Sequence, residues 1–125
     1  MSMLPPIFQT LQDSPSVVAL VAKRIFRHGS APQDVVTVRP YVTWQLVSAI
    51  PANTLSELPS IDNNTIQVDC WSEHDAQVET LAEAVRDAIE PYAHMTGILI
   101  DSRETDTKLF RISLQFDWWK FRPAS

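Results

Sequence analysis

The chain has 125 residues, carries a formal net charge of −5, and is 45% hydrophobic and 20% charged. This composition is typical of a folded protein and excludes a disordered or collagen-like chain. Only two glycines occur, Gly29 and Gly97, so the glycine-paired phosphate loops and the G-x-S-x-G nucleophile elbow are excluded as well. We therefore expect one domain over residues 1–125, without the common nucleotide-binding or hydrolase motifs.

A single cysteine, Cys70, rules out an intrachain disulfide. The longest purely apolar run, residues 17–22, is far shorter than the ~20 residues that a membrane-spanning helix needs. The first residues contain no basic segment followed by an apolar stretch. We therefore expect no secretion signal, no contact with a membrane, and a reducing compartment such as the cytoplasm.

Charge is unevenly distributed along the chain. Residues 61–106 carry eleven acidic residues against two basic ones, Arg86 and Arg103. Such an acidic body repels polyphosphate, so sequence-independent binding of duplex DNA is not expected. The simplest interpretation of the excess is a solvated helix face together with acidic loops.

Two short helices are predicted near the N-terminus. Pro5-Pro6 suits the first turn of a helix that runs to about Gln12. Ser14 followed by Pro15 is typical of an N-cap and the first residue of a second helix. The apolar residues after Pro15 recur at helical spacing, which supports this second helix.

The end of the second helix is left open by the sequence. The helix either stops near Lys23 or runs to His28, where Gly29 would follow the C-cap. The pair Ile25-Phe26, one residue β-branched and the other aromatic, is equally typical of an extended segment. The apolar spacing is compatible with both alternatives, so neither is preferred.

Four β-strands are predicted from the alternation of apolar and polar residues. They cover residues 41–50, 65–71, 98–100 and 108–121. The last strand alternates most regularly, and its apolar face consists of Phe110, Ile112, Leu114, Phe116 and Trp118. Residues 51–64, with the turn cluster 62–64, and residues 101–107 are expected to be loops.

One long amphipathic helix is predicted between the second and third strands. Ser72 is expected to cap it, and Asp75 takes the position of the capping-box acid. Its apolar stripe consists of Val78, Leu81, Ala82, Val85, Ile89 and Tyr92. The predicted order is therefore α-α-β-β-α-β-β. We expect an α+β fold in which a mainly antiparallel four-stranded sheet packs against helices on one face.

The residues that support catalysis or metal binding in other proteins form no recognisable motif here. Cys70 lies on the apolar face of its strand and His74 follows in a turn, so we expect a buried structural cysteine rather than a thiol–imidazole pair. The histidines are widely spaced and no zinc motif occurs, so we expect no metal and no cofactor. Asp69 and Asp117 lie on the polar faces of their strands, which indicates ordinary cross-strand or solvent contacts rather than an acid–base pair.

The tryptophans are the most informative side chains. Trp118 belongs to the apolar face of its strand, so Trp119 and Phe121 must point to the opposite face. Trp71 also falls on the face opposite its apolar neighbours. Either N-terminal helices or loops cover these rings, or the rings contact a second subunit or a partner, since tryptophan is enriched in interfaces. Trp71, Trp119 and Phe121 are therefore the candidate interface residues.

The order of several segments resembles the tail-completion proteins of bacteriophages and prophages, which are similar to tail-terminator and head–tail joining proteins. The segments that carry the resemblance are Pro40-Tyr41-Val42, Pro51 followed by Leu55, residues 66–71, Leu81-Ala82 with Val85-Arg86, and residues 104–118. The last segment is the most specific, because the family typically has an aromatic-Arg-hydrophobic-Ser-hydrophobic strand there, and this chain has Phe110-Arg111-Ile112-Ser113-Leu114.

The resemblance implies a non-enzymatic structural protein. Members are expected to form a homo-oligomeric ring, often a hexamer, that caps the head-proximal end of the tail tube. The ring contacts the tail-tube protein and the head connector, and DNA passes through its lumen without specific binding. The resemblance implies a location in the virion tail, after assembly in the host cytoplasm, and it carries over no catalytic residue. Under this hypothesis the acidic excess of residues 61–106 helps DNA to slide.

Two other classes of function are compatible with the sequence. One is an intracellular protein-binding adaptor that uses an exposed aromatic strand face as a monomer or dimer. The other is a small enzyme built on Cys70 or an acidic pair, which requires a concave pocket around a perturbed titratable group. A closed ring would indicate the tail-completion protein, an exposed aromatic groove would indicate the adaptor, and such a pocket would indicate the enzyme.

Overall fold

The computed structural model describes residues 4–27, 40–51, 61–105 and 108–121, except the side chains of Pro51 and Phe121. Within these residues the chain forms three helices and five strands. In chain order they are α1 (Ile7–Gln12), α2 (Pro15–Val21), β1 (Ile25–Arg27), β2 (Tyr41–Pro51), β3 (Ile61–Ser72), α3 (Asp75–Ile89), β4 (His94–Arg103) and β5 (Phe110–Phe121). The α+β class predicted from the sequence is therefore confirmed.

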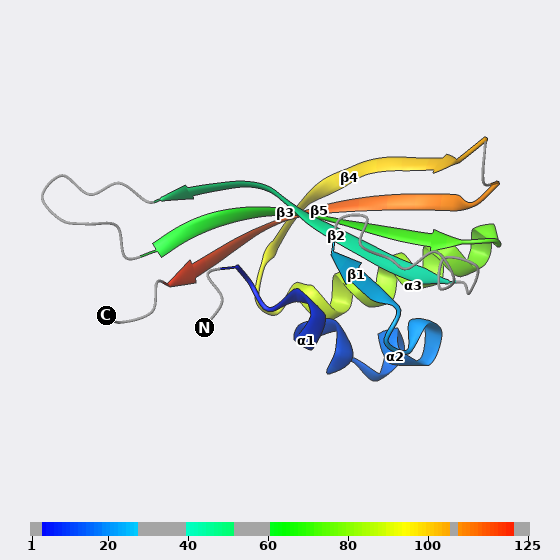
Figure 1. The fold of residues 1–125 in the computed structure, drawn as a ribbon, viewed down its shortest axis with the longest axis horizontal. Helices are drawn as coiled ribbons and strands as arrows, with labels where there is room; N and C mark the ends of the chain where they lie inside the picture. The colour runs from blue at the N-terminus through cyan, green and yellow to red at the C-terminus, as the bar shows by residue number, and fades with distance from the viewer. Residues whose placement is uncertain (1–3, 28–39, 52–60, 106–107, 122–125) are drawn as a thin grey trace, which may run out of the picture.

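The strands form one sheet in the order β1-β2-β3-β5-β4. β1 pairs with β2 in parallel, and every other pair is antiparallel. The helices lie together on one side of this sheet, as Figure 1 shows. α3 packs on β3 and β5, while α1 and α2 pack against α3. We call the side covered by these helices the inner face and the opposite side the outer face.

The sheet differs from the expected one in the number of its strands. α2 ends at Val21, near the first of the two predicted end points, and Ala22 has a positive φ of 51°. The turn leads into Ile25–Arg27, which form β1, and the Val42 amide donates to the Arg24 carbonyl at 2.9 Å. The expectation of four strands is therefore wrong, since the sheet has five and the additional pair, β1 with β2, is parallel. The other three pairs are antiparallel, as expected, so the sheet as a whole is mixed. Three residues are too few to show the alternation that identifies a strand.

β3 begins earlier than the second predicted strand. It starts at Ile61, so residues 62–64 lie in a strand, and the expectation of a turn there is wrong. Asn64 is buried, and its side-chain amide donates to the carbonyl of Trp118 at 3.3 Å. This cross-strand partner overrides the turn preference of Asp and Asn. Residues 52–60, the rest of the predicted loop, lie outside the described residues.

β4 extends beyond the third predicted strand at both of its ends. It begins at His94 and continues to Arg103, so part of the turn expected at residues 101–107 is strand. Its register against β5 shifts twice, between Met95 and Gly97 and again between Ile98 and Ile100. Irregularities of this kind break the strict alternation on which strand prediction depends.

The two predicted N-cap residues have different outcomes. Ser14 caps α2, since its hydroxyl accepts the Val17 amide at 3.4 Å. Ser72 lies in β3, and His74 is the N-cap of α3, so the predicted cap position is wrong. The Ser72 hydroxyl nevertheless accepts the His74 amide at 3.1 Å and donates to Gln77 at 2.6 Å. It therefore connects the end of β3 to the first turn of α3.

The core lies between the inner face and the helices. Its largest fully buried side chains are Phe116, Ile7, Leu11, Ile66, Leu81, Ile89 and Leu114. Burying each aliphatic side chain contributes about 1.5–3 kcal/mol, so this layer is the main source of stability. The predicted stripe of α3 is confirmed from Val78 to Ile89. The prediction is wrong for Tyr92, which follows the helix and is 63% exposed.

Candidate assembly surfaces

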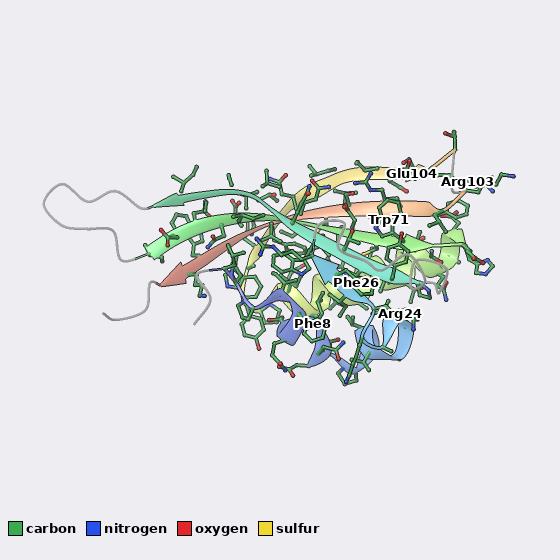
Figure 2. All side chains as sticks on the ribbon, in the orientation of Figure 1. Phe8, Arg24, Phe26, Trp71, Arg103 and Glu104 are labelled. Atoms are coloured by element: carbon green, nitrogen blue, oxygen red, sulfur yellow. The ribbon has the colours of Figure 1, made fainter. Side chains whose placement is uncertain are left out.

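Trp71 lies on the outer face, away from α1, which carries Phe8 (Figure 2). The register places it in one row with Tyr41 on β2 and Arg111 on β5. The Tyr41 ring stacks on it at 5.9 Å between centroids, and the Arg111 guanidinium lies 4.8 Å from the ring centroid. Its indole N–H donates to the Thr43 hydroxyl at 3.1 Å. Trp71 is half-buried by its own sheet, and Figure 2 shows it on the side of the sheet opposite the described helices.

A polar network adjoins Trp71 on the outer face. Asp69 is buried, and its carboxylate accepts hydrogen bonds from Gln67 at 3.0 Å, from Arg111 at 3.2 Å and from the Ser113 hydroxyl. Arg111 also pairs with Glu104 at 3.3 Å. The network therefore joins β3 and β5 to the segment that follows β4. The sequence indicated the polar faces of these strands but not this network.

Asp117 makes the cross-strand contact that its position predicted. Its carboxylate accepts the Thr65 hydroxyl at 3.0 Å, and the two residues are direct partners in the register of β3 and β5. The cross-strand interpretation is also confirmed for Asp69, whose partners Arg111 and Ser113 lie on β5. Neither carboxylate belongs to a paired acid–base arrangement in the described residues.

An apolar patch occupies the outer face where β2, β3 and β5 extend beyond the helices (Figure 1). Ile50, Asn63 and Trp119 form one row across these strands. Ile50 is 60% and Trp119 is 52% exposed. The buried side-chain oxygen of Asn63, between them, has no hydrogen-bond partner. We call Ile50 and Trp119 the strand-end patch. Phe121 is also a predicted interface residue. Its backbone belongs to β5, but its side chain is not among those that the structure describes.

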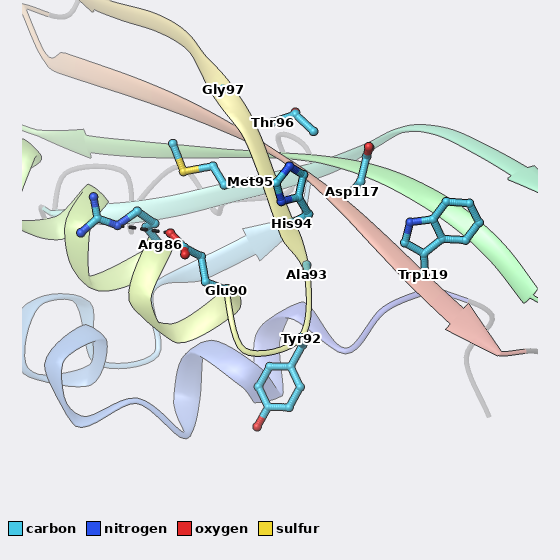
Figure 3. A pocket seen from close by; sticks show the side chains of 10 residues that line it. All are labelled: Arg86, Glu90, Tyr92, Ala93, His94, Met95, Thr96, Gly97, Asp117 and Trp119. Carbon is cyan, nitrogen blue, oxygen red and sulfur yellow. Dashed lines mark ion pairs between the residues drawn. The ribbon is translucent and has the colours of Figure 1, made fainter.

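A hollow of about 550 Å³ adjoins the strand-end patch. Trp119 lines it together with His94 and Asp117, and α3 contributes Arg86 and Glu90, which form an ion pair at 3.5 Å (Figure 3). Its wall therefore combines two large exposed rings, Trp119 and Tyr92, with charged side chains. A shallow mixed surface of this kind suits contact with another protein.

Cys70 is fully buried in the core and does not line the hollow beside Trp119. Burial, together with the neighbouring charge of Asp69, raises the pKa of the Cys70 thiol far above its ordinary value. The prediction of a buried structural cysteine is confirmed. His74 is exposed at the start of α3, so the two side chains do not form a thiol–imidazole site.

We expect Cys70 to react with a thiol reagent such as DTNB at least ~100-fold more slowly in the native protein than in the unfolded chain. The reason is that the reactive thiolate is both inaccessible and disfavoured by burial. The rate of thiol labelling with and without denaturant measures this difference. Equal rates in the two states would show that the thiol is accessible and would contradict the described core.

Neither a metal-binding cluster nor a membrane-spanning helix occurs among the described residues. Within them, no three or more His, Cys, Asp or Glu side chains cluster in a way that would hold a metal ion. In the same part of the chain, none of the helices has the length and apolar character needed to cross a bilayer.

Comparison with known proteins identifies the family. The family model described as tail completion protein gp17 matches residues 5–120, which confirms the resemblance found in the sequence. A chain in the solved virion of a native gene transfer agent particle has a similar fold, with a TM-score of 0.61, 19% identity and 90% coverage of each chain. None of the curated proteins matches the sequence. Because the family model covers nearly the whole chain, this protein belongs to the phage tail completion protein gp17 family and is a structural component of the virion tail.

Proposed function

We propose that this chain is a non-enzymatic subunit that forms a closed ring, with a hexamer as the expected size, at the head-proximal end of the tail tube. In this position the ring stops growth of the tube and joins the tail to the head. Family membership over residues 5–120 is the observation that carries the proposal. A cyclic ring repeats one heterologous contact until it closes, so each subunit needs exposed surfaces that a neighbour can cover.

The strand-end patch supports the proposal because it is such a surface. Trp119 and Ile50 are large and exposed, and Trp119 also lines a hollow, which is the arrangement found at interface hot spots. We assign Trp119 to contact with a neighbouring subunit or a tail partner. Trp71 is a second candidate interface residue, since part of its side chain is exposed on the outer face. Phe121 is a third candidate because of its position on β5.

The partners in this proposal are further copies of the chain, the tail-tube protein and the head connector. DNA passes through the lumen of the ring without specific binding. The net charge of −5 supports this last point, because a protein of the same sign as DNA has little affinity for its backbone. The proposal is non-enzymatic because Cys70 is buried, and because Asp69 and Asp117 are held in cross-strand hydrogen bonds.

We expect Trp119→Ala to weaken assembly by at least ~30-fold while the subunit stays folded, as for the loss of an interface hot spot. Light scattering over a range of protein concentrations measures assembly, both of the chain alone and after addition of tail tubes. Val18→Ala is the matched control, because Val18 is exposed on α2, distant in sequence from the patch.

Two outcomes would contradict the proposal. If the wild-type chain stays a monomer or dimer at all concentrations and also does not bind tail tubes, the ring-forming role is wrong and an adaptor is the better interpretation. If the wild-type chain assembles and Trp119→Ala assembles equally well, the strand-end patch is not part of the interface.

A further inference from the structure

A ring contact requires more surface than the strand-end patch provides. Stable interfaces bury about 800 Å² on each partner, whereas Ile50 and Trp119 are two side chains. Two further apolar surfaces are exposed on the described residues, one on β4 and one beside α1 and β1. The inference below rests on the ring proposed above and concerns which of these surfaces meet.

The first surface is the apolar edge, which we define as Ile98 and Leu99 on β4. β4 pairs with β5 and is an outermost strand of the sheet. Ile98 lies opposite Leu114, on the inner face, yet it is 60% exposed, and Leu99 is 49% exposed. α3 packs on β3 and β5 and does not cover this part of β4. An uncovered edge strand with adjacent exposed aliphatic side chains is normally protected by a charge or a partner.

The segment of the chain that contains the apolar edge is acidic, since residues 61–106 carry eleven acidic residues against two basic ones. Glu79, Glu83 and Asp87 follow one another at intervals of four residues on the exposed side of α3, a spacing at which like charges repel. Arg86 pairs with Asp87 at 3.2 Å, but within the described residues no ion pair reaches Glu79 or Glu83. The hollow lined by α3 and the first residues of β4 shows that the end of α3 lies beside β4 (Figure 3). A cationic partner would relieve this repulsion.

The second surface is a hollow of about 470 Å³ between the start of α1 and the sheet. Its walls include the apolar side chains of Ile7, Phe8 and Trp44, together with two cations, Arg27 and Lys120. The Arg27 guanidinium lies 5.5 Å from the centroid of the Trp44 ring, and Lys120 donates to the carbonyl of Leu4 at 2.8 Å. We call this hollow the cationic cleft. Its lining combines apolar side chains with the positive charges of Arg27 and Lys120.

The geometry points to a head-to-tail contact in which the apolar edge of one copy docks into the cationic cleft of the next copy. The two surfaces are complementary, since exposed aliphatic side chains on an acidic segment of the chain meet an apolar hollow that Arg27 and Lys120 line. β4 is one edge strand of the sheet, and β1, which contributes Arg27, is the opposite edge strand. A contact between opposite sides of one subunit is heterologous, which is the type of contact that closes a ring.

Two blocked variants test this contact. The edge variant combines Ile98→Arg with Leu99→Arg, which places positive charge where the neighbour's cleft is already positive. The cleft variant combines Phe8→Glu with Arg27→Glu, which places negative charge opposite the acidic edge. All four side chains are exposed, so both variants are expected to fold, and circular dichroism verifies this. The control combines Val18→Arg with Ala19→Arg on the exposed side of α2.

We expect each blocked variant alone to be monomeric and the two variants mixed to form a 1:1 dimer, as measured by native mass spectrometry. The mixture stops at a dimer because only the intact edge of the cleft variant and the intact cleft of the edge variant remain to meet. The wild-type chain and the control assemble into the larger oligomer under the same conditions, in solution or on added tail tubes. The wild-type assembly also weakens at high salt, which screens the charges.

Other results overturn the inference. If the wild-type chain and both blocked variants assemble alike, the ring exists and its contacts lie elsewhere. If the blocked variants are monomeric and their mixture is monomeric as well, the edge and the cleft do not bind each other. If the wild-type chain does not assemble in solution or on tail tubes, the ring itself is wrong, and the proposed function fails together with this contact.

Discussion

Replacing Trp118 by alanine is expected to lower the free energy of unfolding by about 3–5 kcal/mol, the usual cost of deleting a large buried aromatic side chain. Trp118 is only 7% exposed, and its ring stacks on Tyr92 at 5.9 Å between centroids. Its side chain closes the core near the end of α3, so truncation leaves a cavity that the rigid sheet cannot fill. Urea unfolding followed by circular dichroism measures the loss.

The adjacent residue provides a matched control, because Trp119 has the same chemistry on the opposite face. Trp119 is 52% exposed, so Trp119→Ala is expected to change the free energy of unfolding by less than about 1 kcal/mol. Comparison of Trp118→Ala with Trp119→Ala therefore separates folding from assembly. Trp118→Ala is expected to reduce stability, whereas Trp119→Ala is expected to reduce assembly. If both variants lose equal stability, the assignment of these two side chains to opposite faces is wrong.

Asp69→Ala is expected to destabilise the protein by about 3–5 kcal/mol, as when one partner of a buried ion pair is removed. The Asp69 side chain is 10% exposed, and its loss leaves Arg111, Gln67 and the Ser113 hydroxyl without their shared acceptor. Arg111 retains Glu104, which places the expected value toward the lower end of the range. Thermal or urea unfolding measures the effect, and Asp69→Asn keeps the shape while removing the charge.

A double-mutant cycle determines how much of this loss belongs to the pair of Asp69 and Arg111. The Asp69→Ala and Arg111→Ala variants, alone and combined, are expected to show a coupling of about 1–3 kcal/mol, since the residues are in direct contact. Additive effects within error would mean that each residue stabilises the sheet independently. The network would then not be the link between β3, β5 and the segment after β4.

The parts of the fold predicted from the sequence are those with long regular patterns. β5 was predicted by the alternation of its apolar residues, and the stripe from Val78 to Ile89 predicted α3. β1 was left open, because three residues carry too little pattern and their pairing with β2 is a tertiary contact. Residues 62–64 were expected in a turn, because the local preference of Asp and Asn does not reveal the buried partner of Asn64.

The candidate surfaces divide in the same way, between features that the pattern of one strand predicts and features that depend on contacts between elements. Alternation along one strand placed Trp119 opposite Trp118, which needs no knowledge of other strands. The Asp69–Arg111 pair joins residues 42 positions apart, and that distance in sequence is bridged only by the register of β3 and β5. The apolar edge was not predicted, because Ile98 is exposed only if α3 leaves β4 uncovered, and the sequence does not show how far α3 covers the sheet.

Electron microscopy of tail tubes incubated with the purified chain tests the central claim most directly. The tubes come from the particle that this chain belongs to, and a tag on the chain marks its position. We expect one ring at a single end of each tube, no further growth of capped tubes, and binding of heads at the same end. Label along the length of the tube, label at the tip distal to the head, or tubes that continue to grow would contradict the account.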